Sequence, residues 1–200
     1  MSSQNWVSLL TPDTIQGSGP GATLNTATTA TLSPVLGSTA DVAQVNAPGF
    51  YQGWATGDLF RVLARGYLTT TATSTTATFL LAARAGNTGT TYVTLATTAG
   101  VATGTGALTG LPWQIDGLIR CTNVATSGNT VSSQFTMWLQ NSASPAVATA
   151  NCVMISAPNA SGETAAAVDT TQIQGLSLRG TLAGANATVV CTEWLVEALC

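Results

Sequence analysis

The side chains of this chain that could carry out acid–base or nucleophilic chemistry are few. Its 200 residues include 5 arginines, 8 carboxylates, no lysine and no histidine, so charged residues make up 6% of the sequence, against about 25% in an ordinary soluble domain. Without histidine, serine and cysteine nucleophiles lack their usual general base. The absence of histidine also excludes histidine-based metal sites, and the absence of lysine excludes Schiff-base chemistry.

Carboxylates are the remaining groups that could act as a catalytic pair. Those beyond the first 55 residues are Asp58, Asp116, Glu163, Asp169, Glu193 and Glu197. Glycoside hydrolysis needs two carboxylates roughly 5 to 9.5 Å apart across a cleft. Glu193 and Glu197 share a face whether their segment is strand or helix, and two solvent-facing charges are the simpler interpretation. No run of closely spaced aspartates indicates calcium. We therefore expect no enzymatic activity, no metal and no cofactor.

The four cysteines are Cys121, Cys152, Cys191 and Cys200, which are widely spaced and form no CxxC pair. Structural metal sites need closely spaced ligand pairs. Three of the four lie in apolar, strand-like stretches, where a free thiol behaves as a small hydrophobic group. We expect reduced, buried thiols, with Cys200 the most exposed.

Charge and hydropathy limit the partners. A net charge of −3 with five scattered arginines cannot supply the basic surface that nucleic acid or anionic lipid requires. No window holds the roughly 18 to 20 uninterrupted apolar residues of a membrane-spanning helix. The opening Met1-Ser-Ser-Gln-Asn-Trp6 has no signal-peptide pattern, so we expect synthesis in a cytoplasm.

Residues 1–55 differ from the rest of the chain. They hold four of the seven prolines, a Gly/Pro tract at 17–21, a Thr/Ala run and only two charges, and such a segment buries too little apolar surface to fold alone. We predict an extended N-terminal arm that lies on a partner surface or adds a strand to a sheet edge. Its candidate anchors are two short apolar clusters: Trp6, Val7, Leu9 and Leu10, and Val35 and Leu36.

From about residue 56 the sequence alternates with a period of two, which indicates β-strands. In 59–68 one face would carry Phe60, Val62, Ala64, Gly66 and Leu68; in 113–121, Trp113, Ile115, Gly117, Ile119 and Cys121; and in 131–139, Val131, Ser133, Phe135, Met137 and Leu139. Further strands are expected in 76–84, 91–98, 146–156, 171–182 and 187–199, about eight in all. Ser127-Gly-Asn129 predicts a hairpin turn.

The only helix candidates are 162–168 and 193–199, and the valines of the second favour a strand. The chain is therefore predicted to be all-β: an antiparallel β-sandwich of jelly-roll type at 56–200, preceded by the arm at 1–55. Within it, Asp116 and Arg120 lie four residues apart on one strand face. We expect Asp116 to pair with Arg61 or Arg65 across strands, or these charges to be isolated and solvated.

Two groups of aromatic residues are candidate contact sites. Phe50, Tyr51 and Trp54 cluster at the junction of arm and sandwich, where they would plug the open end of the sandwich or form a platform for a carbohydrate. Trp138 is expected on the polar face of its strand, and large exposed aromatic side chains are typical interface anchors.

The surface composition favours assembly. A surface of Thr, Ser, Ala, Gly and Asn carries little charge and costs little to desolvate against a copy of itself or a partner lattice. Its contacts would also be nearly insensitive to salt.

At Gly57-Asp-Leu-Phe-Arg-Val-Leu-Ala-Arg-Gly66, Leu80-Leu-Ala-Ala-Arg84 and Leu111-Pro-Trp-Gln-Ile-Asp-Gly-Leu-Ile-Arg120 the chain resembles the jelly-roll structural proteins of tailed bacteriophages. The resemblance covers roughly 56–199 and is one of pattern and composition. It implies a non-enzymatic virion protein made in the bacterial cytoplasm. The implied role is a decoration or minor capsid protein that forms a homotrimer on the capsid surface and clamps the major capsid protein with its arm. The alternative is a glycan- or receptor-binding module of a head spike or tail fibre that uses Trp138 or the cluster at 50–54. Deleting residues 2–40 is expected to leave a folded sandwich that no longer binds capsids.

Overall fold

A computed structural model describes residues 23–25, 29–33, 43–45, 54–71, 73–85, 91–104, 106–142, 152–157, 164–171 and 174–199. None of the described residues is helical, and most of them lie in strands. The all-β prediction is therefore confirmed. In this part of the chain there is no helix that could cross a membrane.

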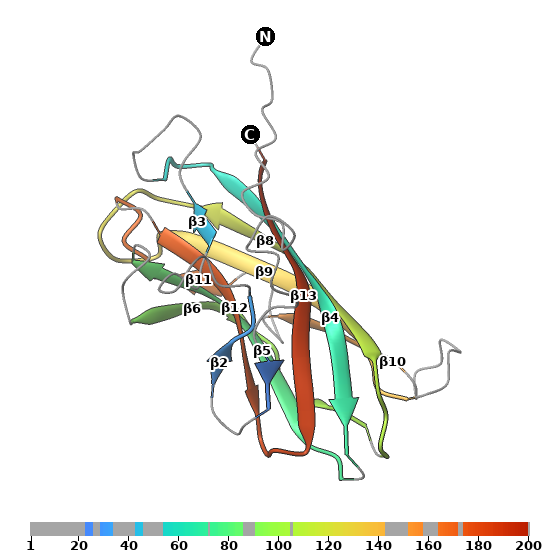
Figure 1. Cartoon of the computed structure of the whole chain (residues 1–200). Coiled ribbons are helices and arrows are strands. Elements are labelled where there is room, and N and C mark those ends of the chain that lie inside the picture. Colours follow the sequence, from blue (N-terminus) through green and yellow to red (C-terminus); the bar gives the residue numbers. More distant parts are fainter. Residues whose placement is uncertain are drawn as a thin grey trace.

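The strands form two antiparallel sheets that pack face to face (Figure 1). The seven-stranded sheet has the order β1 (Thr23–Leu24), β13 (Ala187–Leu199), β4 (Leu59–Thr70), β8 (Leu111–Cys121), β9 (Val131–Gln140) and β10 (Cys152–Ala157), with β11 (Thr164–Ala166) also paired with β9. The six-stranded sheet has the order β2 (Ala30–Thr31), β12 (Gln174–Leu182), β5 (Thr76–Ala85) and β6 (Tyr92–Thr97), with β3 (Ala43–Val45) paired with β12 and β7 (Val101–Ala102) paired with β5.

The strand order does not confirm the jelly-roll prediction. β8, β9 and β10 follow one another along the chain and are also neighbours in one sheet, so they form a meander, whereas a jelly roll is built from two Greek keys. The first link of this meander contains the expected turn at 127–129 and is closed by a hydrogen bond from Thr122 N to Thr130 O of 2.8 Å. The coarser prediction of an antiparallel sandwich stands.

The period-two pattern sets the inner faces of the longest strands, as predicted. Phe60 and Val62 of β4 are fully buried, and so are Ile115 and Ile119 of β8. The two sheets meet through these side chains, with the Phe79 ring of β5 5.4 Å from the Trp113 ring of β8. Gly66 of β4 permits this packing, because a Cβ there would lie 2.6 Å from the Trp113 ring.

β6 departs from simple alternation. The register between β5 and β6 shifts at Leu81/Ala82, and this irregularity buries both Leu95 and Ala96. The carbonyl of Leu95 then accepts a 2.7 Å hydrogen bond from the Ser133 hydroxyl of β9, which joins the two sheets.

Neither helix candidate is helical in its described residues. Residues 164–166 form β11, and 187–199 form β13, which pairs along its length with β4 apart from a register shift between Cys191 and Glu193. Hydrogen bonding to a neighbouring strand and burial of Trp194 and Val196 override the local helical propensity of Glu, Ala and Leu.

Parts of the predicted arm belong to the sandwich. β1 pairs with β13, and β2 and β3 pair with β12. Leu24 and Leu32 are buried in the core, and the Leu32 amide donates a 2.7 Å hydrogen bond to Leu178 O. At these positions the segment completes the edges of its own sheets, so the core does not begin at residue 56.

Candidate functional site

The outer face of the seven-stranded sheet carries a ladder of charged side chains. Arg61 of β4 donates two hydrogen bonds to Asp116 of β8, from Nε to Oδ1 at 3.1 Å and from Nη2 to Oδ2 at 2.6 Å. Arg65 lies 3.6 Å from Glu193 of β13. Of the alternatives given for Asp116, pairing with Arg61 or Arg65 or an isolated solvated charge, the structure shows the pairing with Arg61. Both pairs are about half exposed, so they orient the side chains more than they stabilise the fold.

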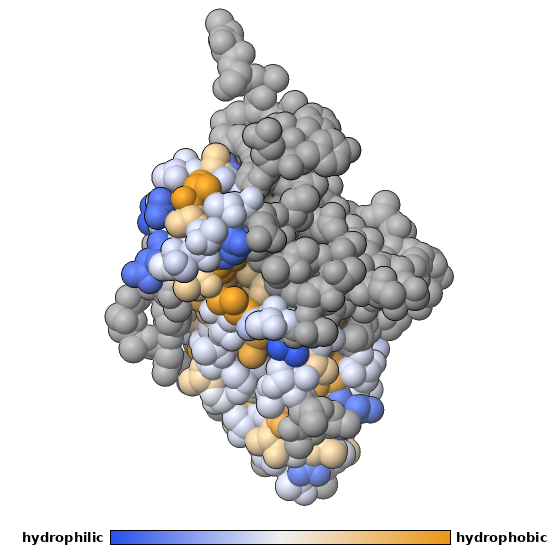
Figure 2. Space-filling view, turned by 90° about the vertical axis from the view of Figure 1, so that its left-hand side faces the viewer, coloured by the Kyte–Doolittle hydropathy of each residue, from blue (hydrophilic) through white to orange (hydrophobic). Residues whose placement is uncertain are grey.

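The exposed charges are concentrated on this face. Among the described residues, the exposed charged side chains are Arg65, Arg120 and Glu193, and the strand register places all three on the outer face of the seven-stranded sheet. Elsewhere the exposed described residues are threonine, serine, alanine, glycine and asparagine, with Val124 as the large apolar exception. Figure 2 shows the same character on another side of the molecule, where pale colours of intermediate hydropathy cover most of the described surface.

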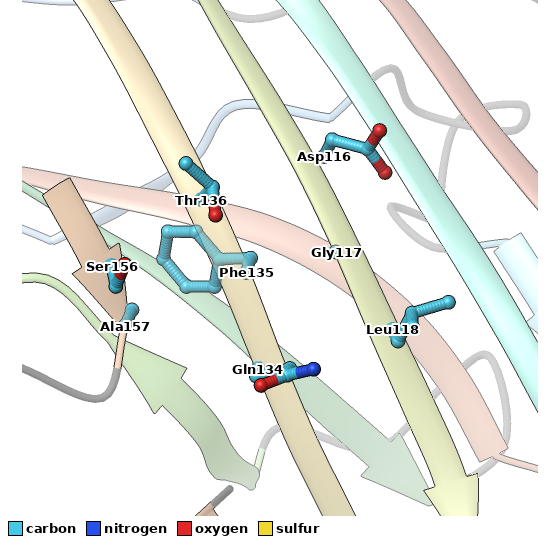
Figure 3. A pocket seen from close by; sticks show the side chains of 8 residues that line it. All are labelled: Asp116, Gly117, Leu118, Gln134, Phe135, Thr136, Ser156 and Ala157. Atoms are coloured by element: carbon cyan, nitrogen blue, oxygen red, sulfur yellow. The ribbon is translucent and has the colours of Figure 1, made fainter. Parts of the chain in front are cut away.

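A hollow of about 400 Å³ lies where β8, β9 and β10 run side by side (Figure 3). Its lining residues are Asp116, Gly117, Leu118, Gln134, Phe135, Thr136, Ser156 and Ala157. The register sets Thr136 between Asp116 on one side and Ser156 on the other, with Phe135 and Ala157 buried beneath.

The hollow coincides with a break in the pairing of β9. β10 pairs with residues 135–140 of β9, and β11 pairs with residues 131–133. Gln134 lies between these two ladders, and its side chain is exposed. The sequence indicated the polar face of β9 but gave no sign that two short strands would share one edge.

Trp138 lies on the outer face of this sheet, as predicted. It is half buried and stands in one row with Gln114 of β8 and Met154 of β10. The Met154 side chain is 73% exposed. Trp138 and Met154 therefore add an apolar border to the polar hollow.

Trp54 lies in the core, at one end of the sandwich. It is 3% exposed, its ring centroid is 5.1 Å from that of Phe60, and its amide donates to Thr170 O at 3.1 Å. This position favours the interpretation of Trp54 as a plug over that of a carbohydrate platform. Phe50 and Tyr51, and the proposed anchors Trp6, Val7, Leu9, Leu10, Val35 and Leu36, lie outside the described residues.

Two of the cysteines are free and buried, as predicted. Burial raises the pKa of the Cys191 thiol to about 12, and burial followed by the nearby Asp58 charge raises the pKa of Cys121. Neither group is a nucleophile at neutral pH. The side chains of Cys152 and Cys200 lie outside the described part.

The described residues bring together no cluster of three or more Cys, Asp or Glu side chains that could hold a metal ion. Glu193 pairs with Arg65 in the ladder, and the register sets Glu197 opposite Arg61, with its side chain outside the described set.

Comparison with known proteins identifies no family. No family model matches the sequence, and no curated protein matches it. Among solved structures, the CBM2 module of the evolved Dit of Lactobacillus casei BL23 phage J-1 aligns over 98% of this chain and 97% of that chain. The sequence identity is 11% and the TM-score 0.35, a similarity too weak to carry an argument.

Proposed function

We propose that this chain is a non-enzymatic virion structural protein, of the kind that decorates a capsid and stabilises it. The observation that carries the proposal is the distribution of charge. The exposed charges of the described residues gather on the outer face of the seven-stranded sheet, whereas the charged side chains with described burial elsewhere, Asp58, Asp169 and Arg179, are half-buried. Most of the remaining described surface can therefore be packed against another protein without burying an exposed, unpaired charge.

The exposed threonines of β6 illustrate such a surface. Thr94 and Thr97 are exposed on the six-stranded sheet, and Arg179 nearby stacks on the Tyr92 ring at 3.9 Å from its centroid. Threonine is stiff at χ1 and loses little side-chain entropy when it is covered. A lattice of identical capsid subunits, or two further copies in a homotrimer, is the partner that this surface fits.

The resemblance of 56–199 to phage structural proteins supports the same role. The location we propose is the capsid surface, with the major capsid protein as the partner and the anchors at 6–10 and 35–36 as additional contacts. The glycan- or receptor-binding alternative does not exclude this role, because Trp138 and the hollow lie on the charged face.

A co-sedimentation experiment tests the proposal. The purified protein is mixed with particles produced by a phage whose gene for this protein has been deleted. We expect wild-type protein and a Thr136→Arg variant to sediment with the particles, and a Thr94→Arg/Thr97→Arg variant to stay in the supernatant. Sedimentation that is equal for both variants, or absent for the wild type, would count against the proposal.

A test of the proposed anchors requires a deletion that leaves the core residues in place. Because Leu24 and Leu32 are buried, removing residues 2–40 would destroy packing, whereas removing residues 2–22 leaves β1 and β2 in place. We expect the 2–22 deletion to keep the thermal midpoint of the full chain and to bind particles at least tenfold more weakly. Unchanged binding would show that the Trp6–Leu10 cluster is not an anchor.

A further inference from the structure

The hollow between β8, β9 and β10 offers polar groups that the protein itself does not use. Within the described part of the chain, the side chains of Gln134, Thr136 and Ser156 make no hydrogen bond. Together they present one amide and two hydroxyl groups, each able to donate and to accept. They come from two neighbouring strands and open into one space of about 400 Å³, which lies within the range of roughly 300 to 1,000 Å³ seen for small-molecule sites.

Asp116 supplies the acceptor of the site. Figure 3 shows its side chain on β8, in the same row as Thr136, with the carboxylate turned toward β4, the strand that carries Arg61. Arg61 holds this carboxylate in place with two hydrogen bonds and neutralises its charge. A carboxylate fixed in this way can still accept hydrogen bonds, because its two oxygens have about four lone-pair sites and Arg61 uses two of them.

The charge balance decides the class of ligand. The described lining contains no cation, and the neighbouring Arg61 is already paired with Asp116, so a phosphate, sulfate or carboxylate ligand would find no partner for its charge. A cationic ligand would find Asp116 already paired. A neutral molecule rich in hydroxyl groups meets neither penalty, since amide, hydroxyl and carboxylate groups together both donate to it and accept from it.

Apolar surface flanks the polar groups. Trp138 lies on the same outer face two residues along β9 from Thr136, roughly 7 Å away at about 3.4 Å per residue, and Leu118 lines the other end. A sugar ring has polar hydroxyl groups on its rim and C–H groups on its faces. A half-buried indole beside a row of polar side chains matches both parts.

We propose that the hollow is a binding site for a neutral oligosaccharide, with Asp116, Gln134, Thr136 and Ser156 bonding its hydroxyl groups and Trp138 stacking against a neighbouring ring. This site is on the charged face and is independent of the proposed docking of the uncharged surface. A decoration protein built in this way would hold the particle with one side and a surface glycan with the other.

A glycan array that carries neutral, sialylated and sulfated oligosaccharides is the probe, followed by calorimetric titration with the neutral oligosaccharide bound best. We expect binding by the wild-type chain, a loss of about tenfold for Thr136→Val and for Gln134→Ala, and a larger loss for Trp138→Ala. Thr94→Val is the matched control, because it removes the same hydroxyl from an exposed strand position on the other sheet, and it should bind within about twofold of the wild type.

The outcomes separate this site from the docking role. A blank array would overturn the site, and so would binding only to sialylated or sulfated glycans, or binding that Thr136→Val and Gln134→Ala leave unchanged. Circular dichroism of each variant shows whether it folds, and Thr136→Val, at an exposed position, keeps the test valid should Trp138→Ala unfold. Sedimentation with particles is measured on the same variants, so a loss of glycan binding is distinguished from a loss of particle binding.

Discussion

Replacing Leu32 by alanine should destabilise the sandwich by about 2–5 kcal/mol. Leu32 is fully buried, and the substitution removes three carbon atoms, worth roughly 2.4 kcal/mol at about 0.8 kcal/mol per carbon, before any cavity term is added. The backbone bond from its amide to Leu178 O survives the change, so the loss reports side-chain packing.

A second substitution, at Gly180 of β12, tests whether the Leu32 side chain lies against that glycine. A Cβ at Gly180 would lie 2.8 Å from Leu32 Cδ1 and 2.9 Å from Leu24 Cδ2, so Gly180→Ala alone should cost about 1–3 kcal/mol by overpacking. In the Leu32→Ala background the new methyl group enters vacated space. The two changes should therefore cost at least about 1 kcal/mol less together than the sum of the single variants.

Urea unfolding followed by tryptophan fluorescence measures these free energies, and the chain has 5 tryptophans to report on it. Asn25→Ala, at an exposed position after β1, is the control and should change stability by less than about 0.5 kcal/mol. A Leu32→Ala variant as stable as Asn25→Ala, or strictly additive effects with Gly180→Ala, would refute the placement of residues 29–33 in the core.

Three further changes test other parts of the structure. Gly66→Ala should cost more than about 3 kcal/mol, because its Cβ would meet the Trp113 ring at 2.6 Å, whereas Gly184→Ala should change the thermal midpoint little. Because the pKa of Cys191 is raised from 9.0 to about 12, the unfolded chain loses this proton first as the pH rises. The stability contributed by the protonated thiol is then present below pH 9 and lost between pH 9 and about 12, and stability should fall more steeply there for the wild type than for Cys191→Ala, by up to about 1.4 kcal/mol per pH unit; equal slopes would contradict the assignment. Thr130→Val should cost about 1–3 kcal/mol in urea unfolding, since its buried hydroxyl accepts from one backbone amide at 2.8 Å and donates to a carbonyl at 2.6 Å, and Thr130→Ser should recover most of the loss.

The long strands were predictable because each buries one face. In β4, β8 and β9 every second residue is apolar or small, and burial of those side chains dominates any local preference, so both the strand and its inner face follow from the sequence. The Arg61–Asp116 pair followed in turn, since opposite charges on neighbouring strands meet across the sheet.

The short strands were not predictable in the same way. β1 and β2 have two residues each and show no periodicity, and the segment that contains them has the composition of a disordered chain. Their positions are determined by the edges of β13 and β12 and by the space beside Gly180. These features lie far away in the sequence. The jelly-roll subtype was not confirmed for a related reason, because the order of strands depends on which edges pair.

The hollow also depends on pairing between distant segments. Gln134, Thr136 and Ser156 are unremarkable polar residues in the sequence, and only the arrangement of β10 and β11 along one edge of β9 brings them around one space. Trp138 was recognised as a candidate contact because it was expected on the polar face of its strand, and large exposed aromatic side chains are typical interface anchors. Trp54 was given two alternatives, a plug of the open end of the sandwich or part of a carbohydrate platform, and its packing against Phe60 favours the plug.

A cryo-electron microscopy difference map between wild-type particles and particles that lack this gene tests the central claim most directly. The account predicts difference density on the outer surface of the head shell, into which the sandwich fits with Thr94 and Thr97 toward the shell and the Arg61–Asp116 face toward solvent. Difference density on the tail alone, or two maps that are identical, would contradict it.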